Sequence, residues 1–180
     1  MGIFANTATD DDIKFLRDNI HIINNWTELR CKEILVDSKS DFYVKSKSYV
    51  LSNYIYGKRN IAFLLMTETN CFGFFTSSGL QVYTPSKTII KRGTEFFSFL
   101  ISRDDNISPK ISELLPGRTE VVSINSPDDQ TVIFNIIDGM TLYSSMDAVF
   151  TPTFHQIYGC TNLDTHNKIH VSRLFILRFE

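Results

Sequence analysis

The stretch from residue 61 to residue 75 constrains the fold of this chain more than any other. Ile61 to Met66 is a continuous apolar run, Thr67 to Asn70 is polar, and a second apolar run extends from Cys71 to Phe75. A short apolar run bounded by turn residues is typical of a strand that is covered on both faces. We therefore predict a buried β-hairpin, in which Gly73 marks a bulge or a close approach of two backbones.

Other strand-length runs surround this hairpin. Asp138-Gly139 is a two-residue hairpin signal, because its turn requires positive φ angles. The last run, from Ile169 to Phe179, is predicted as one strand. The remaining predicted strands are 26–36, 96–101, 121–124, 131–137 and 140–143.

Two helices are predicted in the first third of the chain. Thr9 is the predicted N-cap of the first, and the acidic residues 10–12 follow it at the positive end of the helix dipole. Ile13, Leu16 and Ile20 then form one apolar stripe, and Asn24-Asn25 breaks the pattern. The second helix is predicted within 42–56, with Gly57 as its C-terminal stop.

These elements amount to roughly eight strands and two helices, with the helices early and the hairpins late. The predicted fold class is α+β, a mostly antiparallel β-sandwich flanked by helices. The 180 residues suit one domain, with a helical lead-in over 1–23 and a single compact unit over 24–180. Fifteen Phe and seven Tyr favour a core built from strands.

The composition limits the cellular compartments and the classes of binding partner that we expect for this chain. The net charge of −2 does not indicate a nucleic-acid or anionic-membrane surface. Three cysteines without tight spacing suit a reducing compartment better than a disulfide framework. No run approaches the ~18 apolar residues that span a bilayer, and no signal-peptide pattern opens the chain. We expect a cytoplasmic protein, with a nuclear location as the alternative.

Residues with catalytic or metal-binding chemistry are scattered. His155, Cys160, His166 and His170 lie close in sequence, but strand spacing would place the last two about 13 Å apart. Ser77 lacks the first glycine of a nucleophile elbow, because Phe75 occupies that position. We therefore predict no catalytic residue, no metal and no cofactor. An enzyme of unrecognised type remains an alternative.

The segment 77–93 is predicted to be a long surface loop, either as the exposed recognition segment or as a disordered segment. If this loop folds beside the Gly57 turn, basic side chains from both would gather, with a tyrosine able to stack on a base. The residues of this predicted interaction surface are Lys58, Arg59, Tyr83, Lys87, Lys91 and Arg92. A nucleic-acid-binding, stress-responsive regulator is therefore the second functional hypothesis.

The order of elements over residues 24–179 resembles a TLDc domain, in particular its divergent amoebal members. The resemblance is carried by the sequences WTEL at 26–29, IAFLLMTETNCFGFF at 61–75, FFSFLI at 96–101 and VSRLFILRF at 171–179, with Thr153-Phe154 before the last. The lead-in helix resembles the one that precedes such domains.

This resemblance implies a β-sandwich flanked by helices, without established catalytic residues. It also implies protein binding, a link to the oxidative stress response, and peripheral subunits of the vacuolar proton-pumping ATPase as a partner. The leading functional hypothesis is therefore a non-catalytic protein-interaction module.

Overall fold

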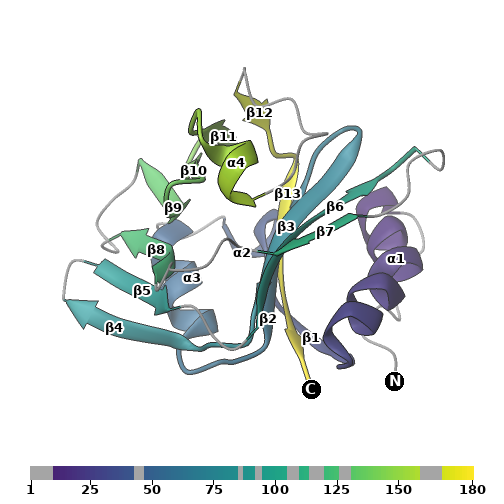
Figure 1. Ribbon diagram of the computed structural model, residues 1–180, viewed down its shortest axis with the longest axis horizontal. Coiled ribbons are helices and arrows are strands. Elements are labelled where there is room, and N and C mark those ends of the chain that lie inside the picture. Colours follow the sequence, from purple (N-terminus) through teal and green to yellow (C-terminus); the bar gives the residue numbers. More distant parts are fainter. Residues whose placement is uncertain are drawn as a thin grey trace.

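The computed structural model describes residues 10–42, 47–84, 87–91, 95–104, 110–113, 120–125, 131–158 and 168–180. Within these residues two antiparallel sheets pack face to face (Figure 1). The predicted fold class, an α+β antiparallel sandwich flanked by helices, is confirmed. No helix in the described part of the chain is both long enough and apolar enough to cross a membrane.

Six strands of the described residues form the first sheet and seven form the second. The order in the first sheet is β1 (Cys31–Asp37), β13 (Arg173–Phe179), β2 (Ile61–Met66), β3 (Asn70–Thr76), β6 (Phe96–Ser102) and β7 (Lys110–Glu113). The order in the second sheet is β12 (Ile169–His170), β11 (Asp147–Phe150), β10 (Met140–Tyr143), β9 (Val132–Ile136), β8 (Glu120–Asn125), β5 (Lys87–Lys91) and β4 (Leu80–Thr84).

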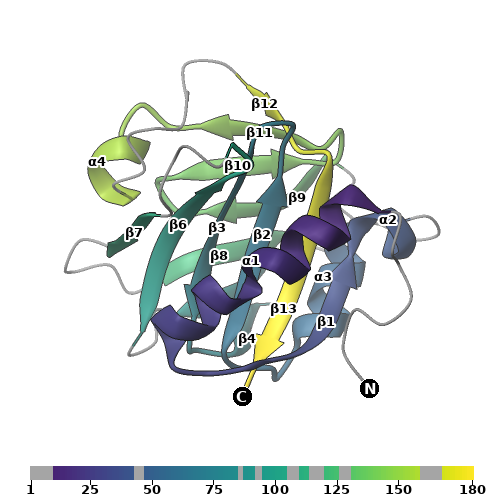
Figure 2. The same ribbon diagram turned by 90° about the vertical axis from the view of Figure 1, so that its right-hand side faces the viewer.

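The helices of the described residues are α1 (Asp11–Thr27), α2 (Ser38–Asp41), α3 (Lys47–Ile55) and α4 (Phe154–Tyr158). Figure 2 shows α1 lying across the outer face of the first sheet. Strand β2 is therefore covered on both faces. Phe63 and Leu65 belong to the core between the sheets, whereas Leu64 and Met66 belong to the core under α1. This double burial explains the continuous apolar run of the sequence.

The predicted hairpin at 61–75 is confirmed as the pair β2–β3, in which Leu64 is opposite Gly73. Gly73 is also a site of close approach, as predicted. A Cβ atom there would lie 2.8 Å from Cζ of Phe99 and closer still to the carbonyl oxygen of Phe63. The glycine is required because no side chain fits between these neighbours.

The prediction for the first helix is wrong at both ends. Asp10 is the N-cap, since its side chain accepts from the backbone N–H groups of Asp12 and Ile13; Thr9 lies outside the described residues. The helix continues to Thr27, and the first strand begins at Cys31 rather than at Trp26. Tertiary contacts explain the extension, because the Trp26 ring packs against aromatic residues of β6 and so belongs to the helical layer.

The second predicted helix is confirmed over Lys47–Ile55, and Gly57 after it adopts a φ of +69°. The short helix α2 was not among the predicted elements. The β9–β10 hairpin is also confirmed. Its loop has three residues, because Ile136 pairs with Met140, and Asp138 takes the positive φ of 53°.

Two further sequence predictions are wrong. The segment 77–93 is not a long loop, because it contains the paired strands β4 and β5. The last segment is two strands in different sheets, because the chain crosses from β12 to β13 at residues 171–172. Strands β7 and β11 and helix α4 were not predicted.

Candidate functional site

The predicted basic surface is partly assembled by the backbone. Lys58 and Arg59 lie in the turn between α3 and β2. A Cβ atom on Gly79 would lie 2.9 Å from the carbonyl oxygen of Lys58 and 3.4 Å from Cγ of Arg59. The turn after α3 therefore packs against the start of β4.

The β4–β5 pairing separates the other predicted residues. Leu80 pairs with Ile90, so the backbone of Lys91 lies at the Gly79 end of the hairpin. Thr84 pairs with Lys87, so Lys87 and Tyr83 lie at the opposite end. Four residues of strand correspond to roughly 13 Å. Arg92 lies outside the described residues.

Other cations gather near this turn, around the residue at the end of β13. Nζ of Lys32 lies 3.1 Å from a carboxylate oxygen of Glu180, and Nη2 of Arg178 lies 2.5 Å from the other. Nε of Arg178 is also 2.8 Å from the carboxylate of Glu33. Arg30 is placed here by its backbone, which donates to and accepts from the backbone of Glu180 at 2.7 and 2.9 Å.

Strand register explains why these residues meet. Cys31 at the start of β1 pairs with Phe179 at the end of β13. Ile61 at the start of β2 pairs with Arg178. These pairings bring three places together at one end of the strands of the first sheet: the segment before β1, the segment before β2, and the end of β13. In Figure 1 this region lies near the C-terminal end of the chain. We call this region the basic end; its cations are Arg30, Lys32, Lys58, Arg59 and Arg178.

The electrostatics of the basic end are dominated by positive charge. The hydrogen bond from Lys32 lowers the pKa of Glu180, and the charges of Arg178 and Lys58 act in the same direction. Glu33 and Glu180 offset part of the charge of the five cations. The whole chain has a net charge of −2, so acidic residues elsewhere in the chain outweigh the excess of cations here.

Exposed tyrosines border the basic end. Tyr56 is 61% exposed and Tyr54 is 50% exposed, both where α3 ends and the Lys58 turn begins. Tyrosine combines an apolar ring with a polar hydroxyl group, and it is enriched at protein interfaces. Together the tyrosines and cations form a surface that suits contact with a partner carrying carboxylates.

The structure describes two of the four residues considered for metal chemistry, His155 and His170. The His155 ring is half-buried beside Phe154, with 5.9 Å between ring centroids. His170 is exposed, and its Nδ1 lies 3.3 Å from the carboxylate of Asp147. Cys160 and His166 lie outside the described residues. Within the described ranges no three His, Cys, Asp or Glu side chains form a group that could hold a metal ion.

Ser77 and the two cysteines that the structure describes, Cys31 and Cys71, lie in places where their side chains hold the fold together or are shielded from solvent. The hydroxyl group of Ser77 accepts from the backbone N–H of Glu95 at 3.0 Å, which ties the end of β3 to the segment before β6. Burial raises the pKa of the Cys71 thiol, and likewise that of Cys31, to about 12. These thiols are therefore protonated at neutral pH, and a thiol rather than a thiolate is a poor nucleophile.

Sequence reasoning did not identify Arg30, Lys32 and Arg178 as members of the surface. Each is a single basic residue beside or within a strand, which is an ordinary solvent-facing pattern. What brings these residues together is the antiparallel pairing of the first and last strands, a long-range feature that a local sequence pattern does not contain. Comparison of the chain with protein-family models gives no match, and comparison with curated proteins gives none.

Proposed function

We propose that this chain is a non-catalytic protein-interaction module of the TLDc type, which contacts an acidic surface of its partner through the basic end. The observation that carries the proposal is the gathering of five cations beside the exposed Tyr56, at one end of the strands of the first sheet. Complementary charge steers association, and an amphipathic aromatic ring supplies contact area.

The same surface is the basis of the alternative, a nucleic-acid-binding regulator, because cations and an exposed ring also suit a single strand. One observation favours a protein partner. The net charge of −2 would oppose a long polyanion away from the basic end. An acidic protein surface offers carboxylates over a limited area and avoids this repulsion.

The finer assignment follows from the family resemblance. Peripheral subunits of the vacuolar proton-pumping ATPase are the partner that it implies, with a role in the oxidative stress response and a cytoplasmic location. The sandwich of two antiparallel sheets with flanking helices agrees with the fold expected of such a domain. We propose these subunits as the first partners to test.

The test is capture of the tagged chain from its own cells in a reducing buffer, with and without nuclease, followed by identification of the captured proteins. The proposal expects recovery of the same protein partner in both arms, with the proton-pump subunits among the captured proteins. Recovery that disappears after nuclease treatment would contradict the proposal and support the nucleic-acid alternative. If no partner is captured in either arm, the proposal is also contradicted.

A further inference from the structure

A pocket of about 200 Å³ lies at the other end of α3 from the basic end. Its walls come from four places in the chain: α2, the start of α3, the turn between β10 and β11, and the crossing from β12 to β13. The residues that line it are Ser38, Lys39, Phe42, Lys47, Met146 and Ser172. None of them belongs to the basic end, so the pocket is separate from the proposed interaction surface.

Lys47 is a cation for which the described residues supply no anionic partner in this pocket. Its ammonium group donates to the backbone carbonyl oxygen of Ser144 and lies 5.8 Å from the centre of the Phe42 ring. Burial lowers the pKa of Lys47, which shows that its charge is partly removed from water. Among the described residues no carboxylate forms an ion pair with it. A ligand anion would supply the missing counter-charge.

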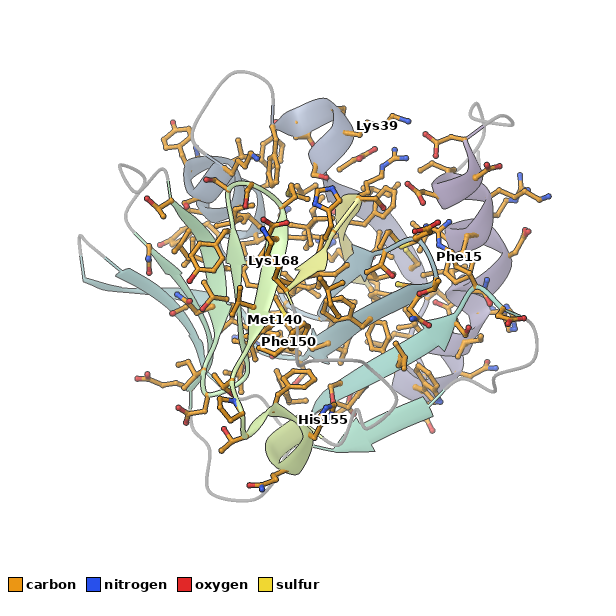
Figure 3. The ribbon with its side chains drawn as sticks, turned by 90° about the horizontal axis from the view of Figure 1, so that it is seen from above. Phe15, Lys39, Met140, Phe150, His155 and Lys168 are labelled. Carbon is orange, nitrogen blue, oxygen red and sulfur yellow. The ribbon has the colours of Figure 1, made fainter. Side chains whose placement is uncertain are left out.

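The second lysine of the pocket is already neutralised. Nζ of Lys39 lies 2.9 Å from a carboxylate oxygen of Asp10, and Figure 3 shows this side chain at α2, on the side of α1. Among the described residues that line it, the pocket therefore presents one uncompensated positive charge. That charge matches a monoanion, such as a carboxylate, better than a dianion such as phosphate.

Two side chains of the wall are apolar. Phe42 and Met146 are half-buried and pack against the core between the sheets. The volume of about 200 Å³ exceeds the ~150 Å³ of an apolar cavity that is large enough to bind benzene. An aromatic ring with one carboxylate is a ligand of suitable size for this space.

The backbone at Met146 is held in a costly conformation. Its φ is 65°, in the left-handed region that non-glycine residues seldom adopt. Two backbone hydrogen bonds maintain this conformation. The N–H of Met146 donates to the carbonyl oxygen of Tyr143 at 2.8 Å, and the N–H of Val171 donates to the carbonyl oxygen of Met146 at 2.7 Å. Such conformations cluster at ligand sites, where the surrounding structure maintains the strain.

We propose that this pocket binds a small monocarboxylate with a flat apolar body, whose carboxylate pairs with Lys47 and whose body lies between Phe42 and Met146. The proposal does not depend on the function of the basic end. Ser38 and Ser172 border the site in fixed positions, because Ser38 Oγ accepts from Leu174 N–H at 2.9 Å and Ser172 Oγ donates to the Met66 carbonyl at 3.2 Å.

The test uses the full chain and benzoate as the probe, with NMR of isotope-labelled methionine methyl groups. Benzoate at millimolar concentration should shift the Met146 signal saturably. The signal of Met140 should stay in place, because it is buried at the far end of β10. Lys47→Met should weaken benzoate binding about tenfold or more, because a charge-assisted bond is lost. Lys14→Met, at an exposed position on α1, is the matched control and should leave the affinity unchanged.

Two further probes on the unmodified chain keep the test valid even if Lys47→Met does not fold. Benzamide, the neutral analogue, should bind about tenfold more weakly than benzoate. Inorganic phosphate should leave the Met146 signal in place. The proposal is overturned if benzoate does not shift the Met146 signal, or if phosphate replaces benzoate with similar affinity. It is also overturned if Lys47→Met binds benzoate as tightly as the wild-type chain does, or if the wild-type chain binds benzamide as tightly as benzoate.

Discussion

The guanidinium group of Arg173 donates to both carboxylate oxygens of Asp10 at 2.8 Å, although 163 residues separate them. On its other side Arg173 binds Asp37, with Nε at 2.7 Å and Nη2 at 2.5 Å. The Arg173 side chain is only 5% exposed and lies 4.5 Å from the centre of the Phe175 ring. This cluster joins the N-cap of α1 to the end of β1 and the start of β13.

Replacement of Arg173 should therefore be severely destabilising. Arg173→Met retains much of the apolar stem but leaves Asp10 and Asp37 without their shared partner. Loss of one member of a buried ion cluster costs about 3–5 kcal/mol of unfolding free energy. Urea unfolding followed by circular dichroism measures the change. Arg17→Met is the control: Arg17 is paired with Asp18 at the surface, and its loss should cost less than about 1 kcal/mol. Equal costs for the two variants would contradict the structural role of Arg173.

The charge of Asp10 makes part of the stability depend on pH. Burial by itself would raise the pKa of Asp10, but hydrogen bonds from Lys39 and Arg173 outweigh burial and hold the pKa well below its ordinary value of 3.8. The folded protein thus keeps this carboxylate ionised where the unfolded chain binds a proton. The contribution is fully present above about pH 4 and is lost as the pH falls further.

Asp10→Asn should expose this dependence, because asparagine preserves the N-cap but not the charge. We expect a loss of about 1.5–3 kcal/mol at pH 7 and a flatter decline of unfolding free energy below pH 4. Unfolding curves at a series of pH values provide the measurement. Asp18→Asn, at an exposed position, should retain the wild-type profile. If the unfolding free energy of Asp10→Asn fell more steeply below pH 4 than that of the wild-type chain, the predicted lowering of the Asp10 pKa in the folded protein would be contradicted.

Gly73 and Gly57 should respond differently to alanine. Gly73→Ala forces a methyl group against the Phe99 ring and the Phe63 backbone, so we expect a loss of about 3 kcal/mol. Gly57→Ala meets no atom within 4 Å, but it places alanine at a φ of +69° and should cost about 1 kcal/mol. Thermal unfolding of the two variants measures the difference. A smaller loss at Gly73 than at Gly57 would contradict the close packing of β2 and β3.

The buried thiol of Cys71 and the half-buried thiol of Cys31 should be protected from modification. Because burial raises the pKa values of Cys31 and Cys71 to about 12, a thiol reagent at pH 8 should react with them slowly in the folded protein and rapidly in urea. Mass spectrometry of the labelled peptides follows each cysteine separately. Rapid labelling of Cys71 without denaturant would show that β3 is more accessible than the structure indicates.

The parts of the fold that the sequence predicts are those with strong local signals. Ile61–Met66 is apolar throughout because both of its faces are covered, and Asp138 and Gly57 mark turns by their backbone preferences. Strands β4 and β5 were missed because each has five residues and they are joined across Pro85. The short alternating pattern of such strands is weak beside a turn signal.

The candidate site depends on long-range pairing, which local patterns do not encode. Arg178 and Lys32 meet only because β13 lies beside β1, and Arg173 reaches Asp37 for the same reason. In sequence, Asp10 resembles a cap and Arg173 resembles a surface residue of a strand. Only the placement of α1 across the first sheet shows that both are part of one cluster.

The most direct test of the central claim compares partner capture by the wild-type chain with capture by Lys58→Gln/Arg59→Gln, after nuclease treatment and at equal protein levels. Both cations lie in the turn of the basic end, and Arg59 is exposed. Lys14→Gln/Arg17→Gln removes the same charge from exposed positions on α1 and serves as the control. If the basic end is the contact surface, the first variant should lose about tenfold in partner affinity while the control retains it. Equal capture by the two variants would contradict the assignment of this surface.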